Sequence, residues 1–323
     1  MRRTLRLLLL TALAILLVPM AARLLPQNAR QNPQAPTAPA ESPTYYRVLE
    51  TETGKLHEVS VRDYLIGAVS AEMPASYEPE ALKAQAVAVH TYAERIKRQN
   101  AETGMLGSAD FTDDPQSYQG FYTDTQLRTL WGAQYEQNYR KIASAVDAVS
   151  GLLLCYQNEP IIAAFHAVSA GMTESAANVW GNDLPYLAAV ESAGDCFAPQ
   201  FENTLQLSPE SLRKALTAVK PDLTFPDDPA EWLNILERSS SGTVLRTEAG
   251  SAEFTGQQIR DALGLRSADF TAAYGDGMFL FVTKGCGHFV GMSQYGANNM
   301  AQNGAGFKEI LQHYYPGTEL QLT

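Results

Sequence analysis

Apolar residues recur at helical spacing in two neighbouring segments of the chain. Those within residues 61–69 predict a helix that begins after Ser60, a residue type favoured at N-caps, and ends at Glu72, two residues before a proline. Those within residues 82–96 predict a longer helix, with Pro79 in its first turn. The pattern therefore places one carboxylate at the end of a helix, beside a tight turn.

The next segments alternate between loop, helix and strand patterns. Residues 100–125 are rich in Gly, Asp, Ser and Thr with interleaved aromatic residues, and so long a loop usually serves a binding site. Residues 126–149 predict a helix, and residues 152–156 and 161–165 predict the two strands of a hairpin.

Capping signals define the elements of the C-terminal half. Ser208 precedes a helical pattern over 209–219, and Thr255 with Gln258 forms a capping box for a helix that ends at Gly264. A strand is expected over 279–283, and helical patterns occur around 298–302 and 307–314. Because helices and strands alternate without a regular βα repeat, the predicted fold class is α+β.

Charge and composition exclude some classes of protein. The chain of 323 residues has a formal charge of −11, although residues 1–40 contain five arginines and no acid. An acidic body has no basic stripe for phosphates, so a dedicated nucleic-acid binder is excluded. With 45% hydrophobic and 18% charged residues, the chain is globular, and three cysteines are too few for a disulfide framework.

The N-terminus predicts a membrane anchor over residues 1–25. The uncharged run 7–22 is flanked by Arg6 and Arg23, which can snorkel to the two interfaces and extend the span. A cleaved signal peptide is the alternative, and both readings place the body outside the cytoplasm. Residues 26–44 include five prolines and predict an extended linker before a domain over 45–323.

Several catalytic templates do not fit. Residues 285–296 contain four glycines, but their spacing differs from a dinucleotide or phosphate fingerprint, and Ser293 does not lie in a nucleophile elbow. H-E-x-x-H and C-x-x-C patterns do not occur, and the five histidines are scattered singly. A metal site would therefore require tertiary assembly.

The run of residues 64–74, which ends in Ala71-Glu72-Met73-Pro74, and the run 80–88 closely resemble the stage II sporulation protein D family, also called the SpoIID/LytB family. The resemblance covers about Tyr45 to Leu320. Further landmarks of that family follow in order at residues 116–120, 165–174, 179–187, 259–267 and 287–296.

The resemblance implies a lytic transglycosylase without a cofactor. Such enzymes cut peptidoglycan glycan strands between N-acetylmuramic acid and N-acetylglucosamine and leave a 1,6-anhydro end. In sporulating bacteria they act in engulfment, with a cell-wall amidase and a polytopic membrane protein as partners. The catalytic glutamate of the family motif corresponds to Glu72.

One carboxylate is sufficient for this reaction. Ordinary glycosidases use two carboxylates, but here the attacking group is the C6 hydroxyl of the sugar itself. Neutral Glu72 would protonate the glycosidic oxygen and, as a carboxylate, would then accept the C6 hydroxyl proton. This needs a raised pKa, which the helix C-terminus and apolar surroundings both favour. Without the family motif, Glu72 would read as a solvated residue at a helix end.

The candidates for substrate binding each have a structural alternative. Gln85 either orients Glu72 or faces a neighbouring turn, and His288 either contacts the sugar or holds its loop. Ser293 and Gln294 either donate to N-acetyl or hydroxyl groups or cap the following helix. Three tyrosines either stack on sugar faces or belong to the core: Tyr118, Tyr186 and Tyr295.

His166 raises the question of zinc. Some members of the family bind zinc through this histidine and two cysteines at six-residue spacing, but Met172 and Asn178 stand at those positions here. We therefore expect no structural zinc and a hydrogen-bonding role for His166. Two other functions stay open at this point: a zinc amidase or peptidase built from Glu72, His166 and His288, and a non-catalytic glycan-binding scaffold that recruits the amidase.

Overall fold

The computed structural model describes residues 45–114 and 118–323. The expected membrane anchor and proline-rich linker lie outside these residues. Within them, none of the helices has the length and apolar character that crossing a membrane requires. The described chain is a mixed α+β structure with several small sheets, in agreement with the predicted fold class.

The body divides into two compact units. Unit 1 comprises the described residues up to Ala164 together with Ala301–Gln312 and Gly317–Thr323, and unit 2 comprises Phe165–Met300 and His313–Pro316.

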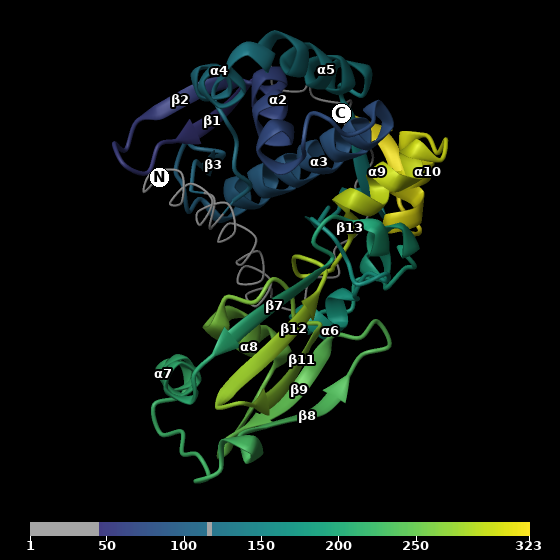
Figure 1. Cartoon of the computed structure of the whole chain (residues 1–323). Helices are drawn as coiled ribbons and strands as arrows, with labels where there is room; N and C mark the ends of the chain where they lie inside the picture. The colour runs from purple at the N-terminus through teal and green to yellow at the C-terminus, as the bar shows by residue number, and fades with distance from the viewer. Residues whose placement is uncertain (1–44, 115–117) are drawn as a thin grey trace. The chain divides into compact units, whose positions relative to one another are not determined.

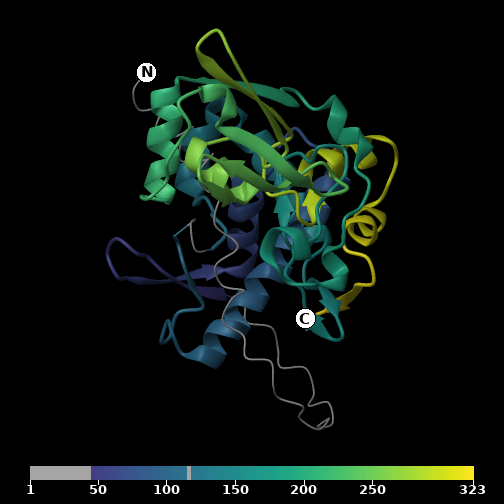
Figure 2. The same ribbon diagram turned by 90° about the horizontal axis from the view of Figure 1, so that it is seen from below.

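Unit 1 combines a set of packed helices with two small sheets (Figure 1). The β1–β2 hairpin projects from the helices in both views (Figure 1, Figure 2). The elements are β1 (Tyr45–Leu49), β2 (Leu56–Ser60), α2 (Val61–Glu72), α3 (Pro79–Thr103), β3 (Phe111–Thr112), α4 (Asp124–Trp131), α5 (Tyr135–Ala148), β4 (Leu152–Tyr156), β5 (Glu159–Pro160), α10 (Phe307–Tyr314, whose last two residues belong to unit 2) and β14 (Glu319–Leu322).

Unit 2 holds two three-stranded sheets and shorter elements around them. The strand orders are β10-β9-β8 and β11-β12-β7, with antiparallel pairing throughout both sheets. The elements are β6 (Phe165–His166), α6 (Ala176–Trp180), β7 (Glu202–Leu207), α7 (Pro209–Val219), β8 (Leu233–Arg238), β9 (Val244–Ala249), β10 (Ala252–Phe254), α8 (Gly256–Leu263), β11 (Phe270–Gly275), β12 (Met278–Lys284), β13 (Met292–Ser293) and α9 (Gln294–Gln302, whose last two residues belong to unit 1).

Local capping explains where several helices begin. The Ser60 side chain accepts a hydrogen bond from the Asp63 amide at the start of α2, and the Ser208 side chain caps α7 in the same way. Thr255 and Gln258 form the predicted capping box of α8, which ends at Gly264 in a left-handed conformation. These predicted helix boundaries are confirmed.

Two predicted elements differ from the structure. The expected helix over 126–149 is divided into α4 and α5, because Gly132 adopts a φ of +50° between them. The expected second hairpin strand over 161–165 is not formed as a strand. The strand of this hairpin that faces β4 is the earlier and shorter β5, Glu159–Pro160, and beyond it a single further hydrogen bond joins the Ile161 amide to the Leu154 carbonyl at 3.1 Å.

The cores of the two units have different compositions. In unit 1, α2, α3 and α5 pack against one another through small and aliphatic side chains, and α3 buries a run of alanines and valines. In unit 2, phenylalanines and leucines contribute equally to the core, with Phe270 and Phe281 fully enclosed at a ring separation of 6.0 Å. The expected site residues are thus supported by two separate cores.

Gly67 allows the loop after β3 to approach α2 closely. The Tyr122 amide donates to the Gly67 carbonyl at 3.2 Å, and a Cβ atom on Gly67 would collide with the Tyr122 carbonyl oxygen. We expect Gly67→Ala to lower the free energy of unfolding of the protein by about 1–3 kcal/mol through this clash. Urea unfolding would measure the change, with Gly275→Ala as the control because Gly275 has open space around it. Equal stability of both variants would contradict the assignment.

Candidate active site

Glu72 is the last residue of α2, where the chain leaves the helix. The C-cap residue Met73 has extended backbone angles, and its amide donates to the Val69 carbonyl at 2.9 Å. A turn closed by the Tyr77 amide and the Pro74 carbonyl then leads into α3. The position of Glu72 between two helices is therefore fixed by backbone hydrogen bonds, as the sequence predicts.

The carboxyl of Glu72 has a strongly raised pKa. The residue is half-buried, and removal of its carboxyl group from water raises the pKa of Glu72 to about 7. Within the described residues, Glu72 forms no ion pair that would oppose this shift. A carboxyl group with such a pKa can both donate and accept a proton near neutral pH.

Two glutamine side chains in unit 1 have buried amide atoms without a hydrogen-bond partner in the described part of the chain. Gln85, on α3, is fully buried, and neither its Nε2 nor its Oε1 atom has a partner within the described residues. Gln119 donates through Nε2 to the Tyr64 hydroxyl and the Val89 carbonyl, each at 3.0 Å, while its Oε1 atom stays unpaired. An unpaired buried amide atom costs about 1–3 kcal/mol, so both side chains have hydrogen-bonding capacity that the described residues do not use.

Tyr64 and Gln119 were not among the predicted site residues. Tyr64 is fully buried on α2, and the Glu72 charge contributes to the raised pKa of its hydroxyl, after desolvation as the main cause. Gln119 lies in the family landmark over 116–120, which was the available signal. Residues 115–117 of that segment lie outside the described residues.

Tyr118 belongs to an aromatic cluster of unit 1. Its ring lies 6.4 Å from that of Phe111, and its hydroxyl is 3.5 Å from the Asn100 amide nitrogen. Phe111 in turn contacts Tyr46 and Tyr64, at ring separations of 5.1 and 4.9 Å. The environment of Tyr118 thus supports the core alternative for this tyrosine, with a polar hydroxyl at the edge.

In unit 2 the glycine-rich loop returns to β6. The short strand β13 pairs in parallel with β6, which places Ser293 opposite His166. The His166 and His288 rings are 5.8 Å apart, and the Trp180 ring is 5.5 Å from His288. Three predicted residues therefore lie together in this unit.

The two histidines are held by backbone groups. His288 Nδ1 accepts from the Val290 amide at 3.0 Å, and the ring makes a second hydrogen bond with the Phe165 backbone. His166 Nδ1 lies 3.3 Å from the Val290 carbonyl, while its Nε2 is buried without a partner within the described residues. The geometry favours a loop-holding role for His288 and the expected hydrogen-bonding role for His166.

Burial keeps both histidines neutral. Desolvation lowers the pKa of His166 to about 3, and desolvation together with the neighbouring His166 and Arg260 lowers the pKa of His288 well below its usual range. Neither imidazole can therefore serve as a cationic acid at neutral pH.

A buried carboxylate that the sequence analysis missed anchors the loop. Asp195 is fully buried, and it accepts hydrogen bonds from the Ser169 amide at 2.8 Å and from the Ser293 hydroxyl at 2.7 Å. The Ser293 hydroxyl also accepts from the Gly296 amide at 3.2 Å, which is the helix-capping alternative. Ser293 is therefore committed to structure, and no sequence signal singled out Asp195.

The other predicted residues of unit 2 have varied surroundings. Gln294 is buried, and its Nε2 has no partner in the described part of the chain. The Tyr295 hydroxyl donates to the Phe197 carbonyl at 3.0 Å, and Tyr186 is only 6% exposed. Gln294 thus retains free hydrogen-bonding capacity, whereas Tyr186 packs into the protein and Tyr295 is partly exposed.

Glu174 forms the second buried carboxylate of unit 2. Burial would raise the pKa of Glu174, but hydrogen bonds from Ser239, Ser241 and other donors lower it. One of those donors is Asn178, whose amide lies 2.8 Å from Glu174. Asn178 stands at one of the two positions where some members of the family have a zinc-binding cysteine. Here its side chain donates a hydrogen bond to the Glu174 carboxylate. Within the described residues, no three His, Cys, Asp or Glu side chains are grouped as a metal site would require.

Comparison with known proteins identifies the family. A family model described as SpoIID, stage II sporulation protein, matches residues 49–156. Stage II sporulation protein D of Bacillus amyloliquefaciens is 37% identical over 281 residues, covering 87% of this chain and 79% of that protein. Its counterpart in Bacillus subtilis is 34% identical over 279 residues, covering 86% and 79%. The amidase enhancer of Bacillus subtilis is 29% identical over 79% of this chain and 40% of its own length. The chain therefore belongs to the SpoIID family of sporulation proteins.

Proposed function

We propose that this sporulation protein is a lytic transglycosylase that cleaves peptidoglycan glycan strands and leaves 1,6-anhydro-N-acetylmuramic acid ends. The observation that carries the proposal is the Glu72 carboxyl, whose pKa is raised to about 7 at the end of α2. It is the glutamate of the family motif, and its pKa suits a group that gives and then takes a proton near neutral pH.

The proposed reaction uses Glu72 twice. Its protonated carboxyl donates to the glycosidic oxygen as the bond from C1 of N-acetylmuramic acid to that oxygen breaks. The resulting carboxylate accepts the proton of the C6 hydroxyl as the C1–O6 bond forms, so Glu72 ends the cycle protonated. The C6 hydroxyl belongs to the same sugar and is present at a high effective concentration, and no second carboxylate is needed.

Gln85 supports this assignment within unit 1. Its buried amide offers a donor and an acceptor that no described residue uses. We propose that the amide orients the carboxyl of Glu72 or a polar group of the sugar, which would meet its hydrogen-bonding capacity. In unit 2, Gln294 has an unused donor of the same kind.

The proposed setting is the outer face of the cell membrane during engulfment. A single N-terminal anchor over residues 1–25 would hold the body outside the cytoplasm. The proposed partners are a cell-wall amidase and a polytopic membrane protein. The name of the Bacillus subtilis relative, amidase enhancer, is in line with an amidase partner.

A zinc amidase is less consistent with the histidines of unit 2. A metal ligand needs a free nitrogen lone pair, but His288 Nδ1 accepts from the Val290 amide and its ring has a second backbone hydrogen bond. Only the Nε2 atom of His166 stays unpaired among the described atoms of these two rings. A glycan-binding scaffold would need no group with the pKa of Glu72.

The products of the reaction distinguish these functions. Peptide-free glycan strands and intact peptidoglycan are incubated with the full-length chain, and the products are identified by mass spectrometry. Anhydro ends support the proposal. Released stem peptides would instead indicate an amidase, and bound but intact strands a scaffold; either result would overturn it.

The rate of cleavage should depend on pH through Glu72. Because the first step needs the protonated carboxyl, we expect a level rate below the pKa of about 7 and a tenfold decrease for each pH unit above it. Initial rates between pH 5 and 9, with substrate well below saturation, would measure this. A rate that stays constant up to pH 9 would contradict the acid role of Glu72.

A further inference from the structure

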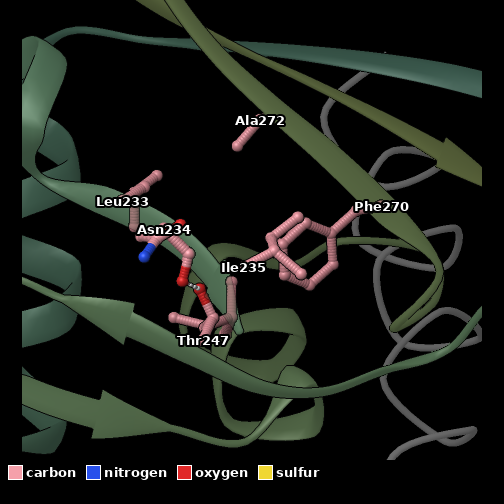
Figure 3. Close-up of a pocket in the computed structure, with 7 residues that line it drawn as sticks. Leu233, Asn234, Ile235, Thr247, Phe270 and Ala272 are labelled. Atoms are coloured by element: carbon pink, nitrogen blue, oxygen red, sulfur yellow. Dashed lines mark hydrogen bonds between the residues drawn. The ribbon is translucent and has the colours of Figure 1, made fainter. Parts of the chain in front are cut away.

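Unit 2 presents two open sheet edges that border one cavity. Strand β8 pairs only with β9, and β11 pairs only with β12, within the described part of the chain. A cavity of about 330 Å³ lies between these two edge strands (Figure 3). Its size is at the lower end of the range for ligand pockets, about 300–1,000 Å³. We call it the β8–β11 slot.

The slot has an apolar floor and is bounded at one end. Its lining includes Ile259, which is fully buried, and Phe270, which is 2% exposed, together with the partly exposed Leu233 and Ala272. Figure 3 shows side chains of β8 and β11 among those that line the space. The Arg238 guanidinium bridges the two strands by donating to the Phe270 carbonyl at 2.6 Å. The slot is thus a built feature of the fold.

Strand β8, which borders the slot, also has apolar surface that is exposed to solvent. Leu236, on β8, is 41% exposed, and a register shift beside it marks a bulge between Ile235 and Glu237. Bulges blunt the end of an edge strand, which leaves Leu233–Ile235 as the part of β8 that can pair regularly. An open edge of this kind is a template for an added strand.

Charge around the slot favours a cationic occupant. Glu231 precedes β8 by two residues, and Glu248 of β9 pairs in register with Asn234, on the face of the sheet opposite Thr247, which lines the slot. Both carboxylates are exposed, and neither forms an ion pair within the described residues. Residues 221–238 contain five acidic residues and one basic residue. A partner with positive charges beside its apolar groups would therefore be attracted here.

We propose that the β8–β11 slot binds an extended segment of a partner protein in which apolar residues alternate with Lys or Arg. The segment adds to the free edge of β8 at Leu233–Ile235 and places one aliphatic side chain in the slot, between Phe270 and Ala272. Its cationic residues alternate with the apolar ones and therefore face the opposite side of the sheet, the side that carries Glu248. This site is independent of the cleavage chemistry at Glu72, so its test does not depend on the proposed function.

The test uses a defined peptide and the full-length chain. The probe is a fluorescein-labelled seven-residue peptide of alternating lysine and valine with isoleucine at its centre, and binding is followed by fluorescence anisotropy. The control peptides carry glutamate in place of lysine, or proline in place of the central isoleucine. Saturable binding of the probe and about tenfold weaker binding of both controls are expected. Equal binding of all three peptides, or binding of none, would overturn the proposal.

Matched variants locate the binding site. Ala272→Trp fills the slot and should weaken binding about tenfold, whereas Ala273→Trp, on the opposite face of β11, should have no effect. Exposed Glu248→Lys disturbs no packing and should also weaken binding, which keeps the test valid if Ala272→Trp does not fold. Hydrogen exchange should slow in β8 when the peptide is bound. Binding that survives Glu248→Lys, or protection that excludes β8, would contradict the assignment.

Discussion

Replacement of Glu72 by glutamine is expected to lower the rate of glycan-strand cleavage by about 10²–10⁴-fold, the usual contribution of a general acid and base. The amide has nearly the same size as the carboxyl, so packing at the end of α2 is retained while the transferable proton is lost. Glutamine can neither protonate the glycosidic oxygen nor accept the C6 hydroxyl proton. Initial rates on peptide-free strands at pH 6 would measure the loss.

A matched control distinguishes the chemical role from a general effect of removing a charge. Glu58 is an exposed carboxylate of β2 in the same unit, and Glu58→Gln should leave the rate unchanged. Binding of strands to Glu72→Gln should also stay close to that of the unaltered protein, because the substitution removes a catalytic group only. Equal cleavage rates of the Glu72→Gln and Glu58→Gln proteins would contradict the proposed mechanism.

The same substitution should stabilise the protein at alkaline pH. An ordinary Glu has a pKa of 4.5, and burial raises the pKa of Glu72 to about 7. The folded state thus holds this proton more tightly than the unfolded state, and the resulting stability is present below pH 4.5 and is lost as the pH rises to about 7. The shift corresponds to about 3 kcal/mol. Glu72→Gln carries no such charge and avoids the loss.

Urea unfolding of both proteins at two pH values tests this effect. At pH 4 the two should have similar free energies of unfolding, and at pH 8 the variant should be more stable by up to about 3 kcal/mol. All other titrating groups are common to both proteins, so their contributions cancel in the comparison. A difference that does not change between pH 4 and pH 8 would show that Glu72 has an ordinary pKa.

Local sequence signals were sufficient to predict where many of the helices begin and end. Capping depends on side chains within three residues of the helix start, so Ser60, Ser208 and Thr255 could be identified without knowledge of the tertiary fold. Glu72 could be placed at the end of α2 for the same reason, since the following Met-Pro turn stops the helix. These features depend on neighbours along the chain.

Features that depend on distant residues could not be predicted. The edge strands β8 and β11 take their positions from the hydrophobic core of unit 2, which the periodicity of either strand does not show. Glu94 illustrates the same limit for charges, because its spacing to Arg98 suits a surface pair. In the structure Glu94 is buried and accepts a hydrogen bond from Tyr46, while Arg98 lies 3.5 Å from Glu159.

The candidate site contains residues that the sequence could identify and residues that it could not. Glu72 and Gln85 were identified from motifs, but the unpaired state of Gln85 follows from tertiary burial. Asp195 and Glu174 support the loops of unit 2. Their roles depend on hydroxyl groups that are distant in the sequence but lie beside them in the structure. Buried polar networks assemble from separate segments, and a single sequence contains little information on such pairings.

The pKa of Glu72 tests the central claim most directly. Full-length protein labelled with ¹³C at the glutamate side-chain carboxyl is titrated by NMR, and the Glu72 signal is assigned by its absence in Glu72→Gln. The account predicts a midpoint at about 7, with the carboxyl largely protonated at pH 6. A midpoint near 4.5, the ordinary value for glutamate, would contradict it, because Glu72 would then be ionised before it could protonate a glycosidic bond.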